Sequence, residues 1–271
     1  MHASIDEGSG RSVLLVHGQP GLGADWSRLA GLLSPDHRVV APDRPGWGGD
    51  ESGATGLRGN AAVLARGVGA CDLQPPLTVV GHSLGGGIAL ELALERPDLV
   101  GSLVLVGSVG VGQAINGFDR LLAVPAVGRP VIRAGLALTR SAMSAVARLA
   151  LLRGGEPVSS RIGQLAMVRS LLWLAAQPTG ERARSSFLIE QRALLEETPT
   201  IELGLGHLDV PVAVVHGTAD RIVAPEAARL LAERIPGAEL VWLKGQGHLV
   251  AFERPELVAP IVRRYAAIGC P

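Results

Sequence analysis

The segment Val79–Gly87 constrains the fold of this chain more than any other stretch. It reads Val-Val-Gly-His-Ser-Leu-Gly-Gly-Gly, so apolar β-branched residues lead into Gly81 and a serine follows at the centre of a Gly-x-Ser-x-Gly pattern. This order predicts a buried strand, a sharp turn at Ser83 and a helix that begins at once. Such a turn holds the serine in a strained backbone conformation and lifts its hydroxyl clear of the sheet. Ser83 is therefore a candidate nucleophile.

The pattern alone is weak because glycine is abundant in this chain. With 36 glycines among 271 residues, a chance Gly-x-Ser-x-Gly somewhere in the sequence has odds of roughly one in four. Its context makes it specific. An apolar strand pattern precedes it, helical spacing over Leu84–Glu95 follows it, and two partner motifs lie downstream.

Apolar runs without polar alternation recur along the chain, and helical spacing separates them. The runs are Ser12–His17, Arg38–Ala41, Leu77–Val80, Val100–Val106, Val212–His216 and Glu239–Leu243. The helical patterns are Trp26–Leu33, Leu57–Cys71, Leu84–Glu95, Pro225–Ile235 and Pro255–Tyr265. Runs of this kind are typical of strands buried on both faces. The alternation predicts an α/β fold with a doubly wound, mostly parallel sheet and right-handed crossovers. Only Ala3–Glu7 is available as a strand before the first run, so we expect a shortened N-terminal edge.

The alternation stops between Val106 and Asp209. Residues 113–206 are rich in Leu, Ala and Arg, have helical spacing, and are interrupted by prolines at 125, 130, 157 and 178. We expect them to form a helical cap (lid) inserted at the carboxyl edge of the strands, where such sheets place their ligand sites. Residues 1–112 and 207–271 would then form the core. An arginine run within the insertion is interpreted as its solvated outer face, with a membrane surface or anionic substrates as the alternative partners.

Composition excludes several other classes of protein. Hydrophobic residues make up 47% of the chain, charged residues 18%, and the formal net charge is +0, so neither disorder nor a nucleic-acid partner is expected. The two cysteines give no disulfide framework and no metal-ligand spacing. The N-terminal residues lack the apolar core of a signal peptide. We expect a cytoplasmic protein, monomer or homodimer, with no metal or cofactor and no role in membranes.

Two loops after later strands supply partners for Ser83. A serine hydroxyl needs a base within hydrogen-bond reach to act as a nucleophile. His248 lies in a Gly-x-Gly-His loop just past the last strand pattern and is the candidate base. The base needs a carboxylate to fix its tautomer, and Asp220 follows the preceding strand. The competing carboxylates Asp209 and Glu226 lie before that strand and within the next helix, so neither is well placed.

The order Ser83, Asp220, His248 is the Ser…Asp…His order of the α/β-hydrolase fold. On these three loops the chain resembles a member of the α/β-hydrolase superfamily, of the kind that has a serine nucleophile and a helical cap. The resemblance covers nearly everything outside the insertion. It implies a hydrolase with a Ser-Asp-His triad that cleaves a carboxylic ester, or a related acyl bond, of a small apolar substrate through an acyl-serine intermediate.

The segment His17–Gly21 is similar to the His-Gly-x-Pro segment of that superfamily. The resemblance implies that the main-chain N–H groups of Gln19 and Leu84 form the oxyanion hole. A donor at the start of a helix also makes physical sense, because its N–H points at the developing charge.

Four further residues near these motifs are interpreted as loop supports. They are His17, His82, Asp43 and Arg44. For Arg44 the expected partner is an acid across the glycine-rich loop Asp43–Asp50.

The position within the superfamily stays open at this point. An aspartate nucleophile is usual in haloalkane dehalogenases and epoxide hydrolases, so Ser83 disfavours both. Hydrolases that cleave carbon–carbon bonds of ring-fission diketones resemble the chain at Gly107–Gly110, but they usually have asparagine in place of His82 and tryptophan in place of Leu249. Cofactor-free perhydrolases share the triad and the His-Gly-x-Pro segment. A ligand receptor on the same fold is the non-enzymatic alternative.

Overall fold

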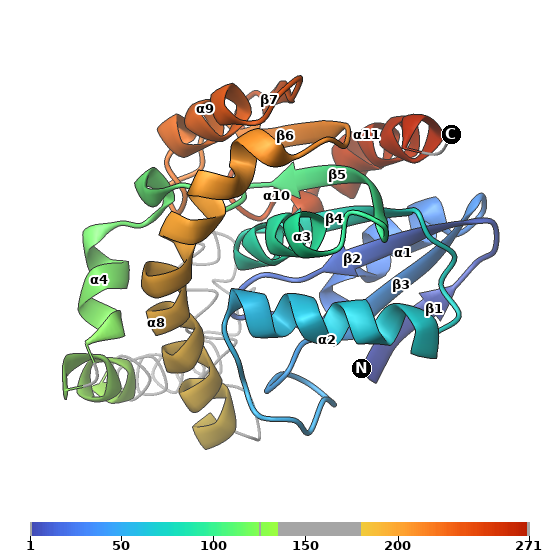
Figure 1. Cartoon of the computed structure of the whole chain (residues 1–271). Helices are drawn as coiled ribbons and strands as arrows, with labels where there is room; N and C mark the ends of the chain where they lie inside the picture. Colours follow the sequence, from blue (N-terminus) through green and yellow to red (C-terminus); the bar gives the residue numbers. More distant parts are fainter. Residues whose placement is uncertain (1, 125, 135–179, 270–271) are drawn as a thin grey trace, which may run out of the picture.

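The computed structural model describes residues 2–124, 126–134 and 180–269 (Figure 1). Three of the four predicted cap prolines (125, 157 and 178), and the arginines of the predicted run beyond Arg133, lie outside these ranges. No helix in the described ranges has both the length and the hydropathy needed to cross a membrane.

The described strands form one seven-stranded sheet in the order β1-β3-β2-β4-β5-β6-β7. Their bounds are β1 His2–Glu7, β2 Arg11–Val16, β3 His37–Asp43, β4 Leu77–His82, β5 Val100–Val106, β6 Val212–Gly217 and β7 Glu239–Leu243. Every neighbouring pair is parallel except β1 and β3. The predicted doubly wound sheet with a single extra N-terminal edge strand is therefore confirmed.

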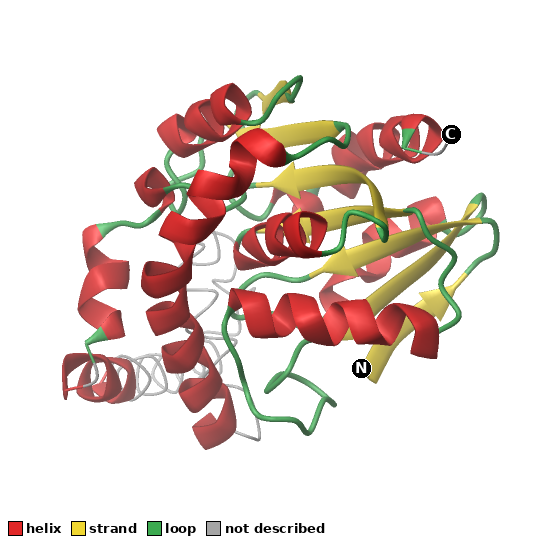
Figure 2. Cartoon of the chain, in the orientation of Figure 1, coloured by secondary structure: helices red, strands yellow, loops and turns green. Residues whose placement is uncertain are grey.

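Helices cover both faces of the sheet (Figures 1 and 2). Their bounds are η1 Gly23–Trp26, α1 Ser27–Leu33, α2 Leu57–Ala70, α3 Leu84–Glu95, η2 Gly112–Ala114, α4 Gly117–Ala123, α8 Gly180–Gly204, η3 Leu205–His207, α9 Pro225–Arg234, α10 Val250–Glu253 and α11 Pro255–Ile268. Buried residues of α2, α3 and α9 share one apolar cluster with the sheet. Those of α1, α10 and α11 share the cluster on its opposite face.

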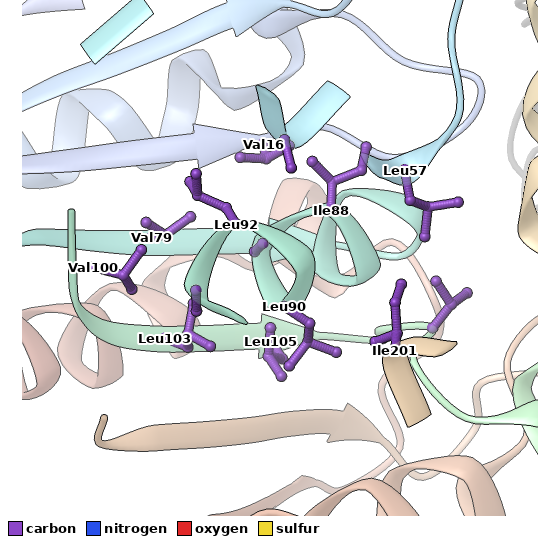
Figure 3. Packing of buried hydrophobic residues seen from close by; sticks show 14 of the residues in the cluster. Val16, Leu57, Val79, Ile88, Leu90, Leu92, Val100, Leu103, Leu105 and Ile201 are labelled. Carbon is purple, nitrogen blue, oxygen red and sulfur yellow. The ribbon is translucent and has the colours of Figure 1, made fainter. Parts of the chain in front are cut away.

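Helix α3 lies at the centre of the larger cluster and fixes the position of the turn before it. Ile88, Leu90 and Leu92 are fully buried, and Figure 3 shows them among side chains of the sheet and of neighbouring helices. Burying a side chain of this size contributes roughly 1.5–3 kcal/mol. Ser83, which immediately precedes the helix, is thereby held against a rigid element.

The insertion between β5 and β6 is helical where it is described, within residues 117–207. Helix α8 packs against α4 and also against α2 and α3 of the core. Its carboxyl end leads through η3 towards β6. In Figure 1, α4 and α8 stand beside the carboxyl ends of the central strands.

Candidate active site

Ser83 occupies the turn between β4 and α3 in a strained conformation. Its backbone angles are φ 54° and ψ −120°, and a non-glycine residue with positive φ of this kind costs about 1–3 kcal/mol. Hydrogen bonds hold the turn: Ser83 N–H donates to the Val106 carbonyl (3.0 Å), and the Ser83 carbonyl accepts from the N–H groups of Gly86 (3.0 Å) and Val109 (3.1 Å). The strain predicted for this position is present.

Glycines make this turn sterically possible. A Cβ at Gly81 would lie 2.5 Å from the Gly85 carbonyl oxygen, and a Cβ at Gly85 would lie 2.2 Å from the Val16 carbonyl oxygen. Both obstacles are backbone atoms, so neither can move aside cheaply. The start of α3 thus lies directly against the end of β2.

Gly85→Ala is expected to lower the free energy of unfolding by about 3 kcal/mol or more, because the new methyl group overpacks the contact with β2. Gly31→Ala is the matched control. Gly31 lies in α1 with no neighbouring atom within 4 Å of its Cβ position, so alanine there is expected to stabilise the protein by about 0.5–1 kcal/mol. Urea unfolding measures both. Equal effects at the two sites would contradict the close approach.

Asp220 and His248 are joined by a hydrogen bond. His248 Nδ1 lies 2.8 Å from Asp220 Oδ2, and both side chains are buried. The other carboxylate oxygen, Oδ1, accepts from the N–H groups of Ile222 (2.8 Å) and Val223 (3.1 Å). Burial alone would raise the pKa of Asp220, but the bond from His248, the charge of that ring, the Ile222 N–H and the charge of His216 outweigh burial and lower that pKa. Asp220 therefore stays ionised and fixes the proton of His248 on Nδ1.

The two rejected carboxylates are elsewhere. Asp209 is exposed in the loop before β6, and Glu226 pairs with Arg229 on the surface of α9. Neither contacts His248.

The serine turn and the His248 loop meet at the carboxyl ends of β4, β6 and β7. The ring of His82, adjacent to Ser83, lies 4.7 Å from the ring of His248 between centroids. A Cβ at Gly107 would lie 3.2 Å from His248 Nδ1 and 3.3 Å from Asp220 Oδ2, so the loop after β5 also borders the pair. Among the described residues, none forms a hydrogen bond with Ser83 Oγ, and catalytic bonds of this kind often tighten only when substrate is present.

The two predicted oxyanion donors adjoin Ser83. Leu84 is the first residue of α3, so its N–H has no acceptor one turn earlier in the helix. Gln19 follows Gly18 in the loop after β2, and a Cβ at Gly18 would lie 3.0 Å from Ser83 Cβ. The Gln19 side chain donates to the Phe187 carbonyl of α8 at 2.6 Å. The main-chain N–H of Gln19 donates to none of the described residues.

All four predicted loop supports bind loop backbone, Arg44 through the His17 and Gly18 carbonyl groups. Asp43 accepts from the N–H groups of Gly23 (2.9 Å) and Gly49 (2.8 Å). His82 Nε2 donates to the His248 carbonyl at 2.9 Å. His17 Nε2 accepts from the Arg44 N–H at 3.1 Å. These bonds tie the loops around the site to one another.

The expected partner of Arg44 was wrong. Its side chain is fully buried and pairs with Glu190 of α8, in the insertion, instead of an acid across the loop Asp43–Asp50. Trp47 Nε1 donates to the same carboxylate at 2.9 Å. The guanidinium points inward because carbonyl oxygens of the loop after β2 lie there as acceptors. Burial raises the pKa of Glu190, and Arg44 and Trp47 act against that rise.

One sequence signal marks Glu190. It lies on the same helical face as the buried residues Ala183, Ser186 and Leu194, and an acid at such a position needs a buried partner. The pattern alone does not identify that partner.

A cavity of about 370 Å³ lies beside His248. Its lining includes Gln19, His82, Leu249 and Phe252. Charged side chains such as Asp25 and Arg28 line it as well, so its wall is a mixture of apolar and polar groups. No cluster of three or more His, Cys, Asp or Glu side chains in the described ranges is placed to hold a metal ion.

His82→Asn is expected to weaken the acid sensitivity of folding. Burial, assisted by the charge of His248, lowers the pKa of His82 from 6.5 to about 3. If Nδ1 took up a proton, none of the described residues would accept a hydrogen bond from it. The unfolded state therefore binds a proton first as pH falls. The contribution of His82 to stability is present above pH 6.5 and is lost towards pH 3.

Between pH 7 and pH 5 this term amounts to about 2 kcal/mol. Urea unfolding at both pH values measures it, and the variant should lose less stability than the parent by about that amount. Asparagine can still donate to the His248 carbonyl. Equal losses in the two proteins would show that His82 does not carry the effect.

Comparisons with known proteins agree with the fold. Residues 13–261 match the model of the family described as "Alpha/beta hydrolase family". A 2-hydroxymuconate semialdehyde hydrolase of Pseudomonas putida is 30% identical over 97% of this chain and 89% of its own. An uncharacterized protein of Mycobacterium tuberculosis is 29% identical over 95% of this chain and 76% of its own.

Among solved structures, a malate-bound thermophilic esterase from Thermogutta terrifontis superposes with a TM-score of 0.74. It is 22% identical, over 98% of this chain and 92% of its own. At that identity the likeness concerns the fold.

Proposed function

Because the chain belongs to the alpha/beta hydrolase family, we propose that it is a serine hydrolase that cleaves a carboxylic ester, or a related acyl bond, of a small apolar substrate. The observation that carries the proposal is the buried Asp220–His248 hydrogen bond at the strand ends where Ser83 stands in a strained turn. That pairing leaves His248 Nε2 as the nitrogen able to accept the Ser83 proton. The residues 1–112 and 207–271 supply this machinery, and 113–206 cap it.

The reaction proceeds in two acyl transfers. Ser83 Oγ attacks the carbonyl carbon while His248 Nε2 takes the hydroxyl proton, and the tetrahedral intermediate places its negative oxygen between the N–H groups of Gln19 and Leu84. His248 then gives the proton to the departing alkoxide, which leaves an ester between the acyl group and Ser83. Water, deprotonated by His248, attacks that ester, and the intermediate collapses as His248 returns the proton to Ser83 Oγ, which releases the acid and restores the enzyme. Asp220 remains ionised throughout and stabilises the imidazolium.

Cleavage of a carbon–carbon bond in a ring-fission diketone is the second candidate. It is favoured by the 30% identity to the 2-hydroxymuconate semialdehyde hydrolase. The two departures from such enzymes, His82 and Leu249, lie in the wall of the cavity beside His248. The chain therefore differs from such enzymes at two residues that a bound substrate would contact, and for this reason ester cleavage remains the first proposal.

The deciding experiment compares p-nitrophenyl esters from acetate to decanoate with a vinylogous diketone. Hydrolysis of esters with an optimum in chain length, and a burst of p-nitrophenol matching the enzyme concentration, would support an acyl-enzyme on an ester substrate. Turnover of the diketone with no ester hydrolysis would favour the second candidate. Turnover of neither substrate would overturn the proposed chemistry.

A further inference from the structure

The Gly18–Gln19 peptide in the loop after β2 links a main-chain carbonyl group that faces the interior to the N–H group of Gln19. The Gly18–Gln19 bond is trans, so the Gly18 carbonyl and the Gln19 N–H lie antiparallel in one rigid plane. Whatever binds the carbonyl therefore sets the direction of the N–H. In the proposed reaction that N–H is one of the two oxyanion donors.

Arg44 binds this carbonyl from the interior. Its Nη2 donates to the Gly18 oxygen at 2.8 Å, and its Nε donates to the His17 oxygen at 3.0 Å. His17 Nδ1 is a second donor to the Gly18 oxygen, at 2.9 Å. The planar guanidinium donates to two successive carbonyl groups at once, so the plane of the Gly18–Gln19 peptide has little freedom to rotate.

Glu190 holds Arg44 in place from the insertion. Its two carboxylate oxygens receive Arg44 Nη1 and Nη2, and Trp47 Nε1 adds a third bond. All three side chains are essentially inaccessible to solvent. Glu190 belongs to α8, and the Phe187 carbonyl of the same helix accepts a hydrogen bond from the Gln19 side chain. Helix α8 is thus linked to this segment in two ways, directly through the Gln19 side chain and indirectly through Arg44.

We propose that Arg44 and Glu190 are positioning residues that lock the Gly18–Gln19 peptide in the orientation from which Gln19 N–H stabilises the oxyanion, so that catalysis requires α8 to be seated on the core. The inference rests on the proposed serine chemistry. It assigns a role in transition-state stabilisation to a buried ion pair that touches no substrate.

The test removes both charges together, because a single buried charge left without its partner destabilises the fold. The variant is Arg44→Met/Glu190→Gln, in which glutamine can still accept from Trp47. The matched control is Arg58→Met/Glu91→Gln. This pair joins α2 to α3 at 2.9 Å and does not contact the loop after β2.

Three readouts apply to each protein: kcat and KM on the best ester, the Ki of a boronic acid that forms a tetrahedral adduct with serine, and the ¹⁵N order parameter of the Gln19 amide. In the Arg44 variant kcat should fall about 10-fold to 100-fold and Ki should rise by a similar factor, while KM stays within about threefold. The Gln19 order parameter should fall from about 0.85 towards 0.6. The control should match the parent in all three.

Parent values of kcat, Ki and Gln19 order in the Arg44 variant would overturn the inference, and so would a loss of kcat without a change in Gln19 order. If the double variant does not fold, Arg44→Lys serves instead, since lysine keeps the charge but lacks the planar group that donates to both carbonyl oxygens. It should then show the same kinetic pattern, and parent kinetics would overturn the proposal. Failure of the serine chemistry is recognised separately, because the parent would then hydrolyse no ester while the Gln19 order parameter still decides the positioning role.

Discussion

Replacement of Ser83 by alanine is expected to lower kcat for ester hydrolysis by about 10⁴-fold to 10⁶-fold. The strained turn that holds residue 83 is built from main-chain bonds to Val106, Gly86 and Val109, so alanine retains its geometry while the nucleophilic oxygen is lost. Binding should persist, and the KM or inhibition constant for a substrate analogue should change little. Steady-state rates and a competitive inhibitor measure the two effects.

Ser108→Ala is the control for this variant. Ser108 is also buried beside the turn, but its hydroxyl bonds only the neighbouring Val109 carbonyl in the described structure. Its kcat should stay within a few-fold of the parent. A Ser83→Ala protein with substantial ester turnover would rule out the acyl-serine mechanism.

Asp220→Asn should reduce kcat by about 10⁴-fold without loss of the fold. The cause is the tautomer of His248. Asp220 Oδ1 accepts two main-chain N–H groups, so the amide oxygen of asparagine is expected to keep that side. Its NH₂ group then replaces Oδ2 and donates to His248 Nδ1, which forces the imidazole proton onto Nε2. A nitrogen that already carries a proton cannot accept the one from Ser83.

The measurement is a pH–rate profile of Asp220→Asn beside Glu226→Gln, an acid-to-amide change on the surface of α9. The control should keep the parent rate. The Asp220 variant should recover part of its activity at high pH, where hydroxide can assist. Parent activity in Asp220→Asn at neutral pH would contradict the role given to the carboxylate.

Local pattern was enough to predict most of the core. Helix α3 and strand β5 begin and end at the predicted residues, because glycine-rich turns and an arginine-proline break delimit them. The pairing of Asp220 with His248 followed from their places after neighbouring strands, since parallel strands bring such loops to one edge. These features are carried by residues close together in the chain.

The error at Arg44 has a physical cause. Its partner lies 146 residues away, inside a helix of the insertion, and no local spacing encodes that distance. The acidic loop Asp43–Asp50 offered nearer carboxylates. The structure uses one of them, Asp43, to cap main-chain N–H groups, which leaves Arg44 free to turn inward.

The placement of the insertion has a consequence for how such proteins diversify. Strands β5 and β6 lie side by side although the whole insertion separates them in sequence. The entropy of closing that loop grows by only about 0.6 kcal/mol for each doubling of its length, so the sheet tolerates grafts of very different size. The Arg44–Glu190 pair restricts this freedom. A transplanted cap must bring an acid to the same place, or the host keeps a buried guanidinium without a counter-charge, at a cost of about 3–5 kcal/mol.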